Sequence, residues 1–408
     1  GVVLGDFSGE IKNSKNASIK AVSEGNEESL AFGISAVSSE GGSLVNEGSI
    51  NVSAKAKDVA FGVATEFWGW YENDEYSLLD GSFSNSGTIN AFAQSDKYAV
   101  ASGLSTDALV EDSTITNSGV ISSNGVSKDV KKAFAYGLVG SELVNSTITN
   151  SGTIEAKVNG KLNNQGFSLN YEDTSGSTIT NEKTGKLYGN IYLGDNGQFV
   201  NKGFVSLPYN ANVLNTIQYL DDDGEPELDY YGSQITRKGG VYISNLVNSG
   251  TIEIGAFKNS NSKIENTQIL TKNATFNAGS KLNVRVEAGS KAFVKGDKLE
   301  QVISAANSLT INELKVNSAT LEFEEVEVKP LTTNSNGKYI DLVVSKVNAF
   351  EEAGNTQGNA TNVSQVLNKL RTDPTLGSLV AKLDTLDAAA LNRALDTLTP
   401  TIAAAISN

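Results

Sequence analysis

The chain contains no cysteine, no histidine and no methionine, and only 5 of its 408 residues are proline. Without cysteine it can form no disulfide, thiolate nucleophile or iron–sulfur site, and without histidine it has no imidazole for a Ser-His-Asp triad or for zinc. These absences exclude several large classes of enzyme. No run of 18 apolar residues occurs, so the sequence predicts no membrane-spanning helix.

The charge balance is acidic, with 47 Asp and Glu against 32 Lys and Arg and a formal net charge of −15. Arginine occurs only at Arg237, Arg285, Arg371 and Arg393. A chain of this composition lacks the basic footprint that a phosphate backbone requires. We therefore expect no nucleic-acid partner and no direct insertion into a membrane.

A short phrase of the form Asn-x-Gly recurs along the chain, always followed by an alternating stretch. It begins at Asn46, Asn85, Asn117, Asn150 and Asn248, with looser copies at Asn201 and Asn277. A second phrase, with glycine at its third position, lies between the copies at 31–34, 60–63, 101–104 and 135–138. Two phrases in constant order, with a unit of about thirty residues, indicate a structural repeat.

Apolar and polar side chains alternate after each Asn-x-Gly. Ile50, Val52 and Ala54 are apolar and the residues between them are polar, and 154–158 and 252–256 follow the same pattern. A period of two predicts β-strands with one buried face. Because aromatic residues make up only 7% of the chain, we expect a thin core of Ala, Val, Ile and Leu.

Short strands, glycine-containing corners and small apolar residues predict an all-β fold in which each repeat is one coil of a parallel β-helix. We expect the asparagines to stack at one corner as a ladder of amide hydrogen bonds. We also expect positive φ at the corner glycines, which are Gly48, Gly87, Gly119, Gly152 and Gly250. The alternative is a sandwich of antiparallel hairpins, which would not need the same phrase at every corner.

Two segments interrupt the repeat. The first contains both tryptophans, and exposed aromatics of this kind either contact a partner or cover the chain's own wall. Its candidate partner-binding residues are Phe67, Trp68, Trp70, Tyr71 and Tyr76.

The second segment that interrupts the repeat is acidic, and its carboxylates are candidate calcium ligands. Their spacing is not that of an EF-hand, and an acidic run is usually a solvated loop. These candidates are Asp221, Asp222, Asp223 and Glu225.

The pattern changes towards the C-terminus. We expect a β-helical stem over residues 1–290, a β cap over 291–350, where strand patterns continue without Asn-x-Gly, and a helical tail over 351–408. Asp373 and Pro374 form a helix-start pair, leucines at a period of 3.6 follow as far as Leu398, and Pro400 ends the helix. The stripe predicts an intramolecular or partner-docking face, with Leu379, Leu383 and Leu386 as candidate contacts.

Polysaccharide-cleaving β-helices use convergent Asp residues, or calcium with Arg or Lys as base. Only Arg237 and Arg285 fall within the repeats, and no Asp pair recurs at a spacing that would stack carboxylates on adjacent coils. We therefore expect no enzymatic activity, with a polysaccharide hydrolase or lyase as the alternative.

Three features in this order resemble the passenger region of Gram-negative autotransporters (type V secretion). They are the Asn-Ser-Gly-Thr-Ile repeats, the stretches 278–284 and 296–299, and the tail 394–400. The resemblance covers nearly the whole chain and implies a right-handed β-helix, an autochaperone-like β cap and a short helical tail. It also implies export across the outer membrane with a β-barrel translocator as partner. The chain begins Gly1-Val2-Val3 without a basic and apolar leader, so if it is secreted we expect its signal peptide to have been removed.

The protease branch of that family needs a histidine, so adhesins, self-associating passengers and surface-layer proteins remain. We accordingly expect an extracellular or cell-surface protein, structural or adhesive, that acts by contact. A β-helix has end edges that must be capped or used, so we expect a homo-oligomer or polymer such as a filament or surface layer.

Overall fold

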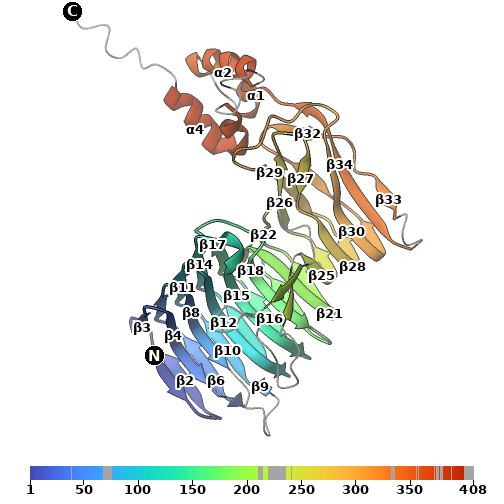
Figure 1. Cartoon of the computed structure of the whole chain (residues 1–408). Helices are drawn as coiled ribbons and strands as arrows, with labels where there is room; N and C mark the ends of the chain where they lie inside the picture. The colour runs from blue at the N-terminus through green and yellow to red at the C-terminus, as the bar shows by residue number, and fades with distance from the viewer. Residues whose placement is uncertain are drawn as a thin grey trace, which may run out of the picture.

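The computed structural model describes the chain except residues 38, 68–75, 210–214, 219–235, 240, 332–335, 355, 357, 372, 374–375, 377–379, 387 and 399–408. Successive coils stack along one axis from the N-terminus, and the C-terminal strands and helices follow at the other end (Figure 1). Equivalent strands of neighbouring coils pair in parallel and in register. The predicted parallel β-helix is therefore confirmed, and the antiparallel sandwich is not formed by the described stem.

One face of the stem is an 11-stranded sheet, which we call the wall sheet. Each coil contributes one strand to it, and β27 pairs antiparallel with β26 at its side. Its strands are β3 (Ser18–Glu24), β7 (Ser49–Lys55), β11 (Thr88–Ser95), β14 (Val120–Ser127), β17 (Thr153–Val158), β20 (Lys186–Tyr188), β22 (Phe204–Ser206), β26 (Thr251–Lys258), β27 (Ile264–Asn266), β29 (Lys281–Val286) and β31 (Lys315–Asn317).

The remaining faces belong to a 21-stranded sheet, to which a coil gives two strands or one long bent strand. Its strands are β1 (Val2–Leu4), β2 (Glu10–Asn13), β4 (Glu28–Ala36), β5 (Ser39–Glu40), β6 (Ser43–Asn46), β8 (Val59–Phe67), β9 (Tyr76–Leu79), β10 (Ser82–Asn85), β12 (Tyr98–Glu111), β13 (Thr114–Asn117), β15 (Ala133–Val144), β16 (Thr147–Asn150), β18 (Gly166–Asp173), β19 (Thr178–Asn181), β21 (Asn190–Asn201), β25 (Tyr242–Asn248), β28 (Ile269–Phe276), β30 (Lys298–Ile311), β32 (Leu321–Phe323), β33 (Val328–Pro330) and β34 (Lys338–Val347). A separate antiparallel pair joins β23 (Asn215–Gln218) to β24 (Thr236–Gly239).

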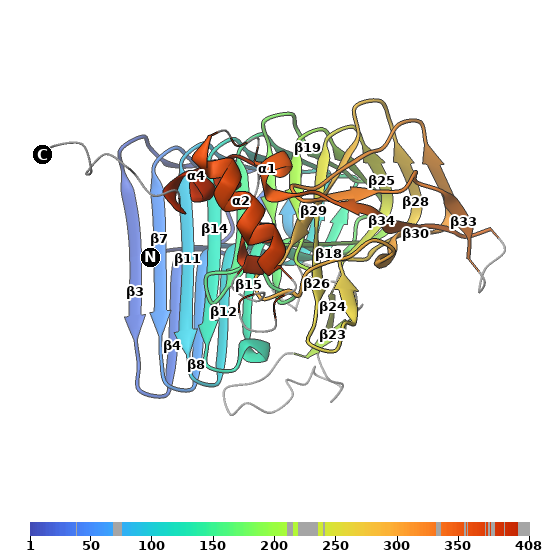
Figure 2. The ribbon, with the colours of Figure 1, turned by 90° about the horizontal axis from the view of Figure 1, so that it is seen from above.

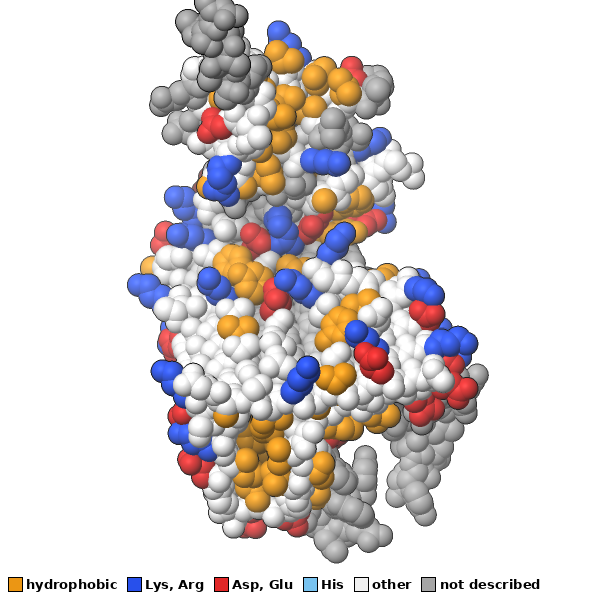
Figure 3. Space-filling model, turned by 90° about the vertical axis from the view of Figure 1, so that its left-hand side faces the viewer, with side chains coloured by type: hydrophobic (Ala, Val, Ile, Leu, Met, Phe, Trp, Pro, Cys, Tyr) orange, Lys and Arg blue, Asp and Glu red, His pale blue; other side chains and the backbone are white. Residues whose placement is uncertain are grey.

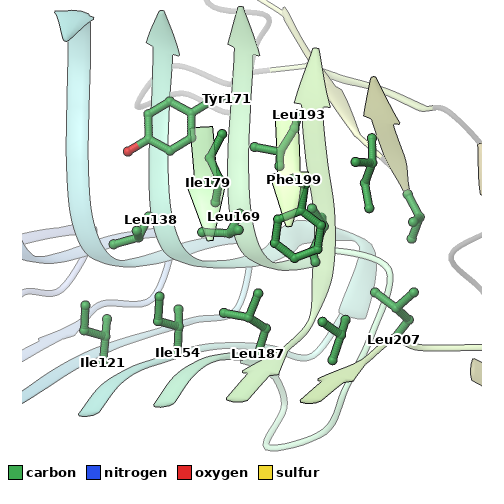
Figure 4. Close-up of a cluster of buried hydrophobic side chains, with 14 of the residues drawn as sticks. Ile121, Leu138, Ile154, Leu169, Tyr171, Ile179, Leu187, Leu193, Phe199 and Leu207 are labelled. Atoms are coloured by element: carbon green, nitrogen blue, oxygen red, sulfur yellow. The ribbon is translucent and has the colours of Figure 1, made fainter. Parts of the chain in front are cut away.

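The core is a column of aliphatic side chains between the two sheets. Ile89, Ile121 and Ile154 occupy the same position on consecutive wall strands and are fully buried. Figure 4 shows Ile121 and Ile154 of this row facing side chains of the other sheet, such as Leu138 and Leu169. Burying each such side chain stabilises the fold by about 1.5–3 kcal/mol.

The asparagine ladder is present at one corner of the stem. Each side-chain amide donates a hydrogen bond to the amide oxygen of the next coil, at 2.7–2.9 Å. The ladder contains the five predicted residues Asn46, Asn85, Asn117, Asn150 and Asn248, together with Asn13, Asn181 and Asn201. Asn277 is not part of it, because Asn248 pairs in register with Phe276.

The expectation that the corner glycines have positive φ is wrong. Gly48, Gly87, Gly119, Gly152 and Gly250 do not have positive φ. Instead the backbone of the preceding coil passes directly against them. A Cβ on Gly119, for example, would lie 2.0 Å from the carbonyl oxygen of Gly87. Glycine is needed there because coils approach closely, not because the backbone is left-handed.

The boundary expected at residue 290 also needs correction. Parallel pairing continues through β30 and β31, since β30 pairs with β28 and β31 with β29. The antiparallel cap begins where β34 pairs with β30, β32 and β33. One strand, β30, thus carries parallel pairing on one edge and antiparallel pairing on the other.

Helical structure is short and divided. In the described residues it comprises η1 (Val130–Lys132), α1 (Phe350–Ala353), α2 (Asn359–Leu370), η2 (Ala381–Thr385) and α4 (Ala388–Leu398). The Asp373 carboxylate accepts a 2.8 Å hydrogen bond from the backbone N–H of Leu376, and Pro374, the other member of the predicted helix-start pair, lies outside the described residues. The single helix expected through Leu398 is not formed, because Leu386 is extended (φ −89°, ψ 144°) between η2 and α4. Pro400 lies outside the described residues.

Candidate functional site: a charged groove on the wall sheet

The outer face of the wall sheet carries the side chains that alternate with the core. Leu187 and Val205 are buried in the core, so their neighbours Lys186, Tyr188 and Phe204 face outward. Pairing places Lys186, Phe204, Thr251 and Lys281 in one row across four coils. Adjacent members of such a row are about 4.8 Å apart, so Lys186 and Lys281 are separated by about 14 Å.

The first hollow, which we call the lysine hollow, lies between this row and the asparagine corner. It has a volume of about 570 Å³. Its lining combines four lysines with small residues of the corner, and Lys202 forms a 3.0 Å ion pair with Glu182. The residues that line it include Lys183, Lys186, Lys202, Phe204, Gly279 and Lys281.

A second hollow, of about 360 Å³, adjoins it on the same face. It is lined by Glu253, Asn283 and Arg285 from the wall sheet and by Asp384 and Leu386 from the helical part. Thr251 and Glu253, like Lys281 and Asn283, are two residues apart on one strand, so the two hollows lie side by side on this face, and we call them together the groove. Seen from above, the helices lie over this side of the molecule (Figure 2), and η2 contacts β29.

Arg285 is the electrostatic centre of the second hollow. It donates hydrogen bonds to the carboxylates of Glu287 (2.7 Å) and Glu253, and to the hydroxyl of Ser206 (2.9 Å). Burial alone would lower the pKa of Arg285, but Glu287 and Glu253 outweigh it and raise that pKa above its usual range. Figure 3 shows acidic and basic side chains next to one another across the middle of the molecule, below the helical part.

The aromatic pair Tyr188 and Phe204 extends the groove along the wall. Their ring centroids are 5.7 Å apart and the rings are tilted by 56°. Burial raises the pKa of the Tyr188 hydroxyl, and the charges of Glu155 and Glu253 raise it further. The hydroxyl therefore stays protonated at neutral pH and can donate a hydrogen bond.

The predicted aromatic contact site is only partly described. Phe67 is not available to a partner, since it is fully buried and stacks on Phe7 at 6.3 Å. It lies at the last position of β8, on the core side of the strand, so the alternation of that strand decides its direction. Trp68, Trp70 and Tyr71 lie outside the described residues, and Tyr76 begins β9.

The predicted leucine contacts are mostly internal. Leu383 and Leu386 are half-buried and pack against the chain's own cluster of Phe350, Val380 and Leu395. They are thus not a free docking face, because the breaks around η2 fold the apolar stripe back on itself. Leu379 lies outside the described residues, as do the calcium candidates Asp221, Asp222, Asp223 and Glu225.

Sequence reasoning did not identify the groove. The signal was available, since the residue after each corner glycine faces outward, and this position holds Ser49, Thr88, Val120 and Thr153 before it changes to Lys186 and Phe204. The change marks the point where the polar wall becomes basic and aromatic. The contribution of the helical part had no such signal, because it depends on how η2 folds back on β29.

No protein-family model matches the chain, and the search of curated proteins finds no match. The autotransporter resemblance thus stays a prediction. In the part of the chain that the structure describes, no helix has the length and apolar character needed to cross a bilayer. The same residues hold no group of three or more acidic side chains arranged for a metal ion.

Proposed function

We propose that the protein is a cell-surface structural or adhesive protein that acts through self-association or through contact with other surfaces, and that the wall sheet is its contact face. The observation that supports this most directly is the continuity of that face. In-register strands from β3 to β31 form one sheet, so a single rigid surface extends along the stem. Such a surface suits an extended partner or a second copy better than a small molecule.

The composition of the face supports the same proposal. Its outer positions in the first five coils are mostly polar, with a few apolar residues such as Val22 and Phe92 among them, and Asn90 donates a 2.8 Å hydrogen bond to Asn51 on the preceding coil. Basic and aromatic residues follow in the groove. A surface held by a repeated backbone ladder loses little conformational entropy when it binds.

The test compares two variants that add the same bulk and charge on different faces. Asn90→Arg with Ser122→Arg obstructs the wall sheet, whereas Thr114→Arg with Thr147→Arg changes exposed positions of the other sheet. Beads coated with each full chain are scored for clustering and for adherence to cultured cells. Electron microscopy of the pure protein shows whether polymers form, and circular dichroism checks that each variant folds.

We expect the wild type and the second variant to cluster or adhere and the wall variant to lose most of this activity. Equal loss in both variants would contradict the assignment of the contact face. Absence of clustering, adherence and polymers in the wild type would contradict the proposed function itself.

One observation favours a polysaccharide-cleaving enzyme as a second candidate. Glu66 accepts a 3.0 Å hydrogen bond from the Ser35 hydroxyl and lies within the influence of Asp107. Burial and the Asp107 charge raise the pKa of Glu66 to about 7, a value suited to a general acid at neutral pH. Release of reducing ends from polygalacturonate, lost in Glu66→Gln, would support this candidate, and no release by the wild type would exclude that substrate.

A further inference from the structure

We propose that the lysine hollow is a subsite for the anionic groups of a linear acidic polysaccharide. The inference deepens the proposed contact function by naming the chemistry of the partner, and it rests on the wall sheet being the contact face. Three features of the hollow support it: its cations, a carboxylate bound at its edge, and the aromatic pair beside it.

The cations of the hollow are available for a ligand. Among the described residues, no carboxylate lies within ion-pair distance of Lys183, Lys186 or Lys281, whereas Lys202 shares Glu182. All four lysines are exposed. In a chain with a net charge of −15, four lysines around one hollow are a local reversal of sign. Such a reversal attracts an anion that the rest of the surface repels.

The edge of the hollow already accommodates a carboxylate. The side chain of Glu313 accepts a 2.9 Å hydrogen bond from the backbone N–H of Gly279. Gly279 lies in the left-handed region (φ +87°) and lines the hollow. Backbone donors in such a turn, with lysines nearby, are a common way to bind carboxylate or sulfate groups.

The neighbouring rings select a sugar rather than a bare anion. Phe204 lines the hollow and packs on Tyr188, so a ligand that meets the lysines also meets an aromatic surface. Aromatic rings with an adjacent hydroxyl offer both an apolar face and a hydrogen-bond donor, which is what a sugar ring requires. The separation of about 14 Å between Lys186 and Lys281 suits a chain that carries repeated charges along its length.

Nucleic acid and anionic membranes fit the surface less well. Both carry dense negative charge and need a broad basic footprint. The lysine hollow is adjoined by Glu253 and Glu287, which hold Arg285 in a closed ion cluster. A flexible chain with spaced charges can engage the lysines without approaching those carboxylates.

The experiment measures binding of the full chain to polygalacturonate and dextran sulfate, with neutral dextran as the uncharged control. The test variant is Lys183→Gln with Lys186→Gln and Lys281→Gln. The matched control, Lys131→Gln with Lys132→Gln and Lys161→Gln, removes three exposed lysines far from the hollow. Each exposed ion pair with the ligand contributes only a modest binding free energy. We therefore expect the test variant to bind on the order of tenfold more weakly and the control to bind like the wild type.

A second variant separates sugar recognition from simple charge attraction. Tyr188→Ser with Phe204→Ser should weaken binding to both acidic polysaccharides while leaving binding of inorganic polyphosphate unchanged. The proposal is overturned if the wild type binds neither polysaccharide at low salt, or if both lysine variants lose binding equally. It is also overturned if single-stranded DNA or phosphatidylglycerol vesicles bind as tightly as the polysaccharides. Bead clustering and adherence are scored separately, so a failure here leaves the contact function standing.

Discussion

The stem and the helical part of this chain are stabilised in different ways. In the stem, each coil repeats the contacts of the coil before it, namely a parallel strand pair, a core aliphatic residue and one rung of the asparagine ladder. In the helical part, Phe350, Val380, Leu391 and Leu395 form one small cluster, beside a single buried ion pair between Arg371 and Asp384.

This difference shows where a single change can act. Repeated contacts are nearest-neighbour contacts, so damage to one coil is partly contained by the coils on either side. A small cluster around one ion pair has no such redundancy. We therefore expect the helical part to be the less robust region, and the following predictions test that contrast.

The largest effect is expected from Asp384→Ala. The Asp384 carboxylate accepts a 2.7 Å hydrogen bond from Arg371, which also lies over the ring of Phe350 at 3.6 Å. Removing one partner leaves a buried guanidinium without its counter-charge, which costs about 3–5 kcal/mol. Hydrogen exchange followed by mass spectrometry should show α2 and α4 exchanging faster while β11 and β14 stay protected.

A paired substitution is the control for this ion pair. Burial raises the pKa of Asp384 and lowers the pKa of Arg371, so desolvation outweighs their attraction. Arg371→Met with Asp384→Leu should therefore leave the helical part about as stable as in the wild type. Simultaneous loss of protection in the stem after Asp384→Ala would show that the two regions unfold as one unit.

The next effect is expected from Asn117→Ala, in the middle of the ladder. Asn117 accepts from Asn85 and donates to Asn150, and the site is buried. The substitution removes two ladder bonds. The amide of Asn85 keeps a 3.3 Å bond to the Val120 carbonyl, but the buried amide oxygen of Asn150 loses its donor, and together these losses cost about 3 kcal/mol. Urea unfolding followed by circular dichroism measures the change.

Asn277→Ala is the matched control for the ladder. Asn277 belongs to a copy of the same sequence phrase but accepts only an exposed 3.2 Å bond from Asn312. Its loss should change the free energy of unfolding by no more than about 0.5 kcal/mol. Equal effects at the two positions would contradict the claim that burial decides how much an asparagine of this phrase stabilises the stem.

The two regions also differ in how far the sequence predicts them. The stem was predictable because its constraint recurs. Ile121 and Ile154 fall at the same place in each repeat, and Asn117 and Asn150 precede the same turn. Asn13 and Asn181 were missed because Asn13-Ser14-Lys15 and Asn181-Glu182-Lys183 lack the glycine that marks the phrase.

The groove and the helical part were less accessible to sequence reasoning because they depend on contacts between distant segments. Arg285 meets Ser206, 79 residues away, and Arg371 meets Asp384 only because the chain turns back between α2 and η2. The leucine stripe up to Leu398 correctly predicted helical structure, but its period could not predict that the chain is extended at Leu386. Local patterns predict which residues are apolar, whereas tertiary contacts decide what they face.

A glycine of the stem and a glycine of the helical part resist substitution by alanine for different reasons. In the stem, a Cβ on Gly119 would lie 2.0 Å from a backbone oxygen, so Gly119→Ala must push coils apart and should cost about 2 to 3 kcal/mol. In the helical part, Gly358 has open space around it, but its φ of +60° and ψ of −132° are almost confined to glycine, so Gly358→Ala should cost about 1 to 3 kcal/mol through backbone strain alone. Urea unfolding of the stem and hydrogen exchange at α2 measure the two effects, and a Gly119→Ala variant as stable as the wild type would contradict the close-approach argument.

The last effect is a pH dependence confined to the stem. Burial and Asp107 raise the pKa of Glu66 to about 7, so the folded stem holds a proton that the unfolded chain has released above about pH 4.5. The free energy of unfolding should therefore fall as the pH rises from about 4.5 to about 7, by about 2 kcal/mol.

Glu66→Gln removes this titration. The free energy of unfolding of the variant should match that of the wild type at pH 4.5 and exceed it by a similar amount at pH 7.5. Urea unfolding at both pH values measures this, with Glu155→Gln on the wall sheet as the control. A wild type whose stem stability rises between these pH values, or a Glu66→Gln variant that keeps the wild-type pH dependence, would show that Glu66 is ionised in the folded stem.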